Sequence, residues 1–229
     1  MARARAVSAP VSEARVNTFV AQVFLMMTVG LAVTGLVSVW VSRQLELLLR
    51  ISTNPWIAFG LFILQIMLVA ALSASVTRMS AGAAALLFLI YSGLTGITLS
   101  SIFLIYTQEQ IAQVFWLTAG TFLITGLFGL LFKRDLSAAG NILFMLLCGW
   151  TLAWMFSWLF PYSTFSWGLT YLGIALFVGL TAWDTQQIKL LGQQIGSHPA
   201  KGGLVVIGAL KLYLDFINLF LLILRASRR

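Results

Sequence analysis

The chain has 229 residues, of which 60% are hydrophobic and only 9% are charged, a composition too apolar for a soluble core. The formal net charge is +8, but the basic residues are scattered at the ends of apolar runs, so a membrane explains them better than nucleic acid does. The single cysteine, Cys148, excludes an intrachain disulfide and a cysteine-based metal site.

Seven apolar runs are each near or above the roughly 20 residues that a helix needs to cross the hydrocarbon of a bilayer. The connections between them are short, and none is long enough to hold a soluble domain. The sequence therefore predicts an all-α integral membrane protein, a seven-transmembrane-helix bundle that forms a single domain over residues 1–229. In chain order, the expected spans are Val16–Val41, Ile57–Val76, Gly82–Tyr106, Ile111–Phe132, Ala138–Phe160, Ser166–Leu190 and Gly203–Arg225.

Lysine and arginine residues in the connections indicate the orientation, because cytoplasmic loops carry an excess of them. With a cytoplasmic N-terminus, eight basic residues lie inside and five lie outside. The connections after the third and fifth spans carry no basic residue, which supports this choice, whereas the basic C-terminus argues against it. The first 15 residues lack the pattern of a signal peptide. We therefore expect a multi-pass protein of the inner (plasma) membrane with its N-terminus in the cytoplasm.

Two aspartates lie at membrane depth. Asp184 follows the apolar run Gly168–Trp183, and Asp215 lies inside the run Leu204–Leu224. A carboxylate in a bilayer is costly unless it is paired, protonated or solvated, so an intramembrane acid is by default a functional residue. Two neighbouring carboxylates can share a proton, and their oxygens suit a hard cation such as Ca²⁺, although two carboxylates alone supply too few ligands. The pair predicts a proton or cation site, with a fixed salt-bridge network as the structural alternative.

Other polar residues share helix faces with the aspartates. Lys211, Asp215 and Asn218 follow the i, i+4, i+7 spacing that places side chains on one face of a helix. Thr181 and Asp184 share a face of the sixth helix. Such a polar stripe should face the bundle interior rather than lipid. Thr181 and Asn218 are therefore candidate pathway residues, whereas Lys211 could neutralise Asp215 and be purely structural.

Three segments resemble motifs of the Bax inhibitor-1 family, also called the transmembrane Bax inhibitor motif proteins. Residues Thr181–Lys189 (TAWDTQQIK) resemble the sixth-helix motif, and residues Leu212–Phe220 (LYLDFINLF) resemble the last-helix motif. Residues Tyr91–Leu99 (YSGLTGITL) are similar to the third-helix segment. The resemblance covers the whole chain in span count and motif order, and the sequence looks like a bacterial member.

The resemblance implies a seven-helix bundle with the last helix central. It also implies a pH-sensitive calcium leak channel, not an enzyme and without a cofactor, in which Asp184 and Asp215 form the sensor and contact the permeant Ca²⁺. An arginine at the end of the second helix, here Arg78, is expected to latch Asp184. Lys211 departs from the family pattern, in which a small or neutral residue is usual. Lys211 is therefore a second candidate gating residue beside Arg78, and its positive charge is expected to weaken cation binding or to shift the sensing pH.

Three alternatives stay open at this point. Some bacterial relatives are thought to regulate a membrane protease, so the chain could contact a membrane protein partner without conducting ions. An intramembrane aspartyl protease also has aspartates on two adjacent helices, but the Gly-x-Gly-Asp segment is missing before Asp215 and no proline follows Pro199. If the chain were a retinal protein, Lys211 would form the Schiff base, but this chain lacks the third-helix aspartate of such proteins. The expected partners are the lipid bilayer, protons and Ca²⁺, and no nucleic acid.

Overall fold

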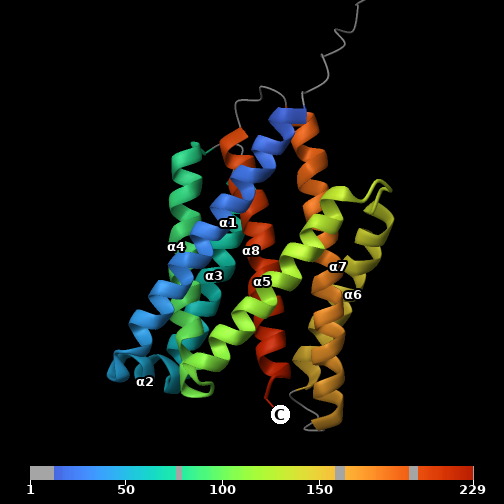
Figure 1. Ribbon diagram of the computed structural model, residues 1–229. Helices are drawn as coiled ribbons and strands as arrows, with labels where there is room; N and C mark the ends of the chain where they lie inside the picture. The colour runs from blue at the N-terminus through green and yellow to red at the C-terminus, as the bar shows by residue number, and fades with distance from the viewer. Residues whose placement is uncertain (1–12, 76–78, 158–162, 196–200, 229) are drawn as a thin grey trace, which may run out of the picture.

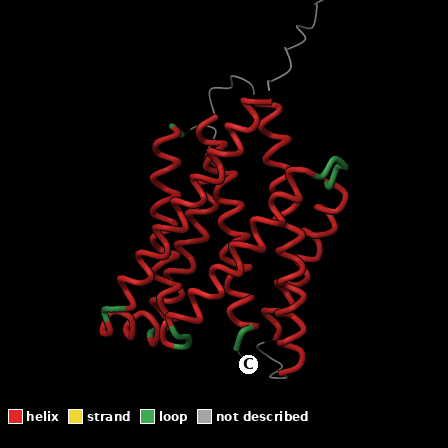
Figure 2. The backbone as a smooth tube through the Cα atoms, in the orientation of Figure 1, coloured by secondary structure: helices red, strands yellow, loops and turns green. Residues whose placement is uncertain are grey.

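The computed structural model describes residues 13–75, 79–157, 163–195 and 201–228, which form helices with short connections (Figures 1 and 2). Seven helices in these ranges are long and apolar enough to cross a membrane, and no strand occurs in them. The predicted class, an all-α protein with seven transmembrane helices, is confirmed. In chain order, the helices are α1 (Glu13–Ser42), α2 (Leu45–Thr53), α3 (Pro55–Ser75), α4 (Ala81–Leu99), the 3₁₀ helix η1 (Ser100–Leu104), α5 (Gln108–Leu131), α6 (Ser137–Ser157), α7 (Ser163–Ile195) and α8 (Lys201–Ala226).

The short helix α2 lies in a connection where the sequence predicts no helix. It has nine residues, too few to cross a bilayer. Leu48 and Ile51 are buried on one side of it, while Glu46 and Arg50 form an exposed ion pair with 3.3 Å between Oε1 and Nη2. The helix therefore covers one end of the bundle, below α1 and α3 in the view of Figure 1.

Local sequence signals explain where two of the helices begin. The Thr107 hydroxyl accepts a hydrogen bond from the Gln110 backbone N–H at 3.2 Å, and the Gln110 side chain accepts one from the Thr107 N–H at 3.0 Å. This reciprocal capping box starts α5. Pro55 is the first residue of α3, a position at which proline loses no helical hydrogen bond. The Asn54 carboxamide oxygen accepts a hydrogen bond from the Trp56 N–H at 3.0 Å.

A polar node joins α1, α4 and α8 near the middle of the bundle. The Thr34 hydroxyl donates to the Ser92 carbonyl at 2.9 Å and lies 2.7 Å from the Tyr213 hydroxyl. The Ser38 hydroxyl donates to the Gly96 carbonyl at 3.0 Å. A Cβ atom at Gly96 would lie 2.6 Å from the Thr34 carbonyl oxygen, so α1 and α4 approach closely only because this residue is glycine.

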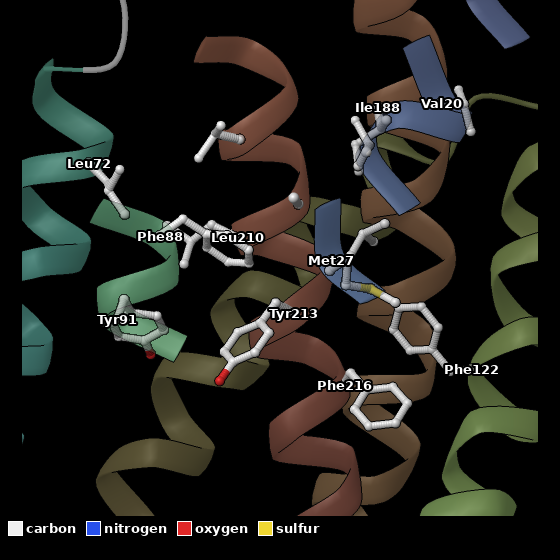
Figure 3. Close-up of a cluster of buried hydrophobic side chains, with 14 of the residues drawn as sticks. Val20, Met27, Leu72, Phe88, Tyr91, Phe122, Ile188, Leu210, Tyr213 and Phe216 are labelled. Carbon is white, nitrogen blue, oxygen red and sulfur yellow. The ribbon is translucent and has the colours of Figure 1, made fainter. Parts of the chain in front are cut away.

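Aromatic side chains from α4, α5 and α8 fill the core beside this node (Figure 3). The Tyr213 ring lies 5.5 Å from Phe88 and 5.8 Å from Tyr91 between centroids, and Phe122 lies 5.5 Å from Phe216. All are near edge-to-face arrangements, which aromatic pairs prefer. Helix α8 packs against α1, α4, α5 and α7, and it has the largest buried share of the seven spans in the described ranges.

Candidate functional site

The carboxylate of Asp184 on α7 and the ammonium of Lys211 on α8 form an ion pair. Nζ of Lys211 lies 3.4 Å from Oδ1 of Asp184, and the lysine and aspartate side chains are 48% and 11% exposed, respectively. The ammonium also lies 5.7 Å from the centroid of the Trp183 ring, within the range of a cation–π attraction. Lys211 therefore contacts two consecutive residues of the neighbouring helix.

The second aspartate, Asp215, is buried one helical turn from Lys211 on α8. Its carboxyl is close enough to that of Asp184 for the two groups to interact directly. Within the described part of the chain, Oδ2 of Asp215 has no hydrogen-bond partner. The structure thus brings the two aspartates together as expected, with a lysine beside them, and leaves one buried carboxyl oxygen unsatisfied.

This group of two carboxyls and one ammonium has limited capacity for a metal ion. No cluster of three or more His, Cys, Asp or Glu side chains occurs in the described ranges. Ca²⁺ takes six to eight oxygen ligands in proteins, and the ammonium of Lys211 already occupies one oxygen of Asp184. The arrangement therefore suits a proton or a passing cation better than a resident ion.

The other candidate site residues have different surroundings. The Thr181 hydroxyl is buried and donates to the Phe177 carbonyl at 2.8 Å. The Asn218 amide donates to the Leu214 carbonyl at 2.9 Å, and its side chain lines a separate cavity of about 330 Å³ whose lining includes neither aspartate. Both donors are thus used within their own helices, as is common for short polar side chains in helices. The expected latch, Arg78, lies outside the described residues.

Two residues of α7 that were not among the predicted site residues hold the end of α5 and the connection that follows it. The Gln186 amide donates to the Arg134 carbonyl at 2.9 Å, and its oxygen accepts from the Leu136 N–H at 2.8 Å. The Lys189 ammonium donates to the Leu130 carbonyl at 2.7 Å, and cations favour the C-terminal end of a helix. Both residues belong to the polar run that follows Asp184, and this polarity at the end of an apolar span is the sequence feature that could have indicated their contacts.

Helix α6 approaches α7 beside the ion pair. A Cβ atom at Gly140 would lie 2.1 Å from Cε2 of Trp183, far inside van der Waals contact. Glycine therefore leaves the space that the indole ring occupies. Because the same ring lies 5.7 Å from the Lys211 ammonium, Trp183 is packed between Gly140 and Lys211.

Comparison with known proteins identifies the family of this chain. The model of the family described as "Inhibitor of apoptosis-promoting Bax1" matches residues 16–227. The chain belongs to the Bax inhibitor-1 family. The resemblance that the motifs of α4, α7 and α8 indicated is therefore confirmed.

Several bacterial proteins are similar to this Bax inhibitor-1 protein along nearly their whole length. "Inner membrane protein YbhL" of Escherichia coli (strain K12) is 45% identical over 214 residues, which cover 93% of this chain and 92% of that protein. An uncharacterized protein of Borreliella burgdorferi is 39% identical over 210 residues, covering 91% and 90%. One of Deinococcus radiodurans is 34% identical over 210 residues, covering 92% and 90%. This Bax inhibitor-1 protein is thus a multi-pass membrane protein.

Proposed function

We propose that this protein is a pH-sensitive cation leak channel that passes Ca²⁺, with Asp184 and Asp215 as the pH sensor. The observation that carries the proposal is the burial of two interacting carboxyls beside one ammonium. With both carboxyls ionised, the three groups have a net negative charge that attracts a cation. With one proton added, they are neutral together, and the attraction is lost.

Lys211 is proposed as the internal counter-ion of this sensor. Its ammonium pairs with Asp184, so a permeant cation has to compete with it for the carboxylate. The lysine side chain is about half exposed, and its long flexible stem allows the ammonium to move away while the stem stays packed. Arg78 remains a proposed second latch, by the family resemblance.

The proposal does not include an enzymatic activity. Aspartyl proteases work with two carboxyls that share one proton. In this protein the ammonium of Lys211 engages one of the two carboxyls directly, and this arrangement does not favour the symmetric sharing of a proton that such a protease needs.

We also propose that the N-terminus lies in the cytoplasm and that the protein is in the inner membrane. The distribution of lysine and arginine over the connections supports this orientation, and the name of the Escherichia coli relative supports the location. Labelling of single cysteines at position 133, just after α5, and at position 108, the first residue of α5, tests the orientation, because the two positions lie at opposite ends of this helix. Selective labelling of position 108 from the periplasmic side is expected.

The function is tested by calcium flux into liposomes. Purified protein is reconstituted with a calcium-sensitive dye inside, and uptake is followed between about pH 5 and 8, where a shared proton is expected to be exchanged. We expect uptake that requires the protein and changes with pH. Equal uptake with and without protein at every pH would reject conduction and would favour a regulatory role through a membrane protein partner.

A further inference from the structure

We propose that the protein binds one anionic phospholipid in a cavity on the side of the bundle, with an acyl chain in the cavity and the phosphate at Arg43. The cavity has a volume of about 690 Å³ and lies between α1, η1, α5 and α8. It is distinct from the carboxyl site, because neither aspartate lines it. We call it the lateral cavity.

The lateral cavity opens toward the lipid between α1 and α5. Leu36 on α1 and Trp116 on α5 both line it, and each is 73% exposed. Figure 1 shows α5 crossing in front of α8, with α1 descending beside it. In a bilayer this opening faces hydrocarbon, so the molecules that reach it first are lipids.

The lining of the cavity suits an acyl chain. It is mainly aliphatic and aromatic, and its hydroxyl groups are already bonded within the protein. The Thr28 hydroxyl donates to the Phe24 carbonyl at 2.8 Å, Thr34 belongs to the polar node, and Ser38 donates to Gly96. A hydrocarbon chain would therefore leave none of these hydroxyl groups without a hydrogen-bond partner, whereas a polar ligand would find few free groups to bond with.

The length of the cavity matches one leaflet of the bilayer. Its lining runs along α1 from Thr28 to Arg43, a distance of about 22 Å at 1.5 Å per residue. One leaflet, including its headgroup region, is also about 20–22 Å thick. Arg43 follows the last residue of α1, Ser42, so its guanidinium lies at headgroup depth when Thr28 is near the bilayer centre.

Arg43 supplies the charge that selects an anionic headgroup. It is exposed at the end of the lateral cavity and forms no ion pair in the described part of the chain. Arg50, at the same end of the bundle, is paired with Glu46 and does not line the cavity. A guanidinium binds phosphate oxygens through two parallel hydrogen bonds, so Arg43 can hold a lipid phosphate while the acyl chain fills the cavity.

Native mass spectrometry of the full-length protein in detergent tests the proposal. Phosphatidylglycerol and phosphatidylcholine with identical acyl chains are titrated separately, and the bound fractions are compared. Both lipids carry a phosphate, but phosphatidylcholine also carries a choline cation that the Arg43 guanidinium repels, so the wild type should bind phosphatidylglycerol about tenfold more tightly. Arg43→Gln should reduce that affinity to the phosphatidylcholine level, and the matched control Arg50→Gln should leave it unchanged.

A second pair of variants tests the cavity itself. Gly35 lines the lateral cavity, and a Cβ atom added there would meet no other atom within 4 Å. Gly35→Leu should therefore fill the cavity and weaken binding of both lipids, and Gly149→Leu, at an exposed position on α6 with equal space, should not. Equal affinity of the wild type for both lipids, or unchanged binding by Gly35→Leu, overturns the proposal.

Discussion

Lys211 lies one turn from Asp215 along α8, yet its ammonium pairs across the helix interface with Asp184, with 3.4 Å between Nζ and Oδ1. Side chains in a helix lean toward its N-terminus, so Lys211 reaches away from the turn that holds Asp215. A lysine four residues before an aspartate is also the weaker order for an ion pair within one helix. The pairing therefore links α7 to α8 rather than neutralising Asp215 within α8.

Removing the charge of Lys211 should strengthen the response to cations. In Lys211→Met, an incoming cation no longer competes with the ammonium for Asp184, so calcium flux in liposomes should rise. The pH midpoint of the flux should move to higher pH, because a nearby positive charge favours the charged form of a carboxyl and this charge is lost. Lys211→Arg, which keeps the charge, is the control. A midpoint that stays in place in Lys211→Met contradicts a role for Lys211 in the sensor.

Replacing either aspartate should remove most of the pH dependence of flux. Asp184→Asn and Asp215→Asn each eliminate one carboxyl of an interacting pair, and the titration belongs to the pair rather than to one residue. The effect of the double variant, relative to the wild type, should therefore be smaller than the sum of the two single effects. Additive shifts in the pH midpoint would show that the two groups titrate independently.

Adding a methyl group at Gly140 should destabilise the packing of α6 against α7. In Gly140→Ala the new carbon overlaps the Trp183 ring, so we expect a loss of about 1–3 kcal/mol in the free energy of unfolding, the usual cost of overpacking. The matched control is Gly149→Ala on the same helix, where nothing lies within 4 Å of the added carbon. Thermal unfolding in detergent measures both, and equal melting temperatures would count against the close contact.

The exposed carboxyl of Asp135 should not contribute to pH sensing. Hydrogen bonds from Ser137 hold the pKa of Asp135 below its usual range, with 2.8 Å from the Ser137 nitrogen to Oδ1. Because the folded pKa is the lower one, the stability that this contact contributes is fully present above the unfolded pKa and is lost as the pH falls through the folded value. Asp135→Asn should therefore leave the flux profile between about pH 5 and 8 unchanged, and a shifted profile would contradict this assignment.

The sequence predicted the membrane helices well because each is a long apolar run, and length and hydropathy alone define such a helix. It did not predict α2, since nine residues with both polar and apolar faces resemble a connection. It also ended the sixth span at Leu190, whereas α7 continues to Ile195. The polar residues after Asp184 resemble a loop, but Gln186 bonds to the connection after α5 and Lys189 bonds to the end of α5, and both contacts stabilise the helix there.

The candidate site was only partly predictable for a related reason. Spacing along one helix placed Lys211 and Asp215 on the same face, and the family motifs indicated Asp184 as the partner of Asp215. Neither signal contains the rotation of α7 relative to α8, so the Lys211–Asp184 pair and the contact with Trp183 follow only from the three-dimensional arrangement. The same holds for Asn218, whose spacing suggested the carboxyl site but whose side chain lines another cavity.

The close contact of α5 with α7 has a mechanical consequence. A Cβ atom at Gly129 would lie 2.2 Å from the Ala182 carbonyl oxygen, and the Lys189 ammonium donates to the adjacent carbonyl of Leu130, so this end of α5 is held against α7. The opposite end, at Gln108, borders the lateral cavity and is about 32 Å away at 1.5 Å per residue. A tilt of about 5° about this contact would move that end by about 3 Å over this lever arm, so a small displacement beside Asp184 would become a larger one at the opposite end of α5.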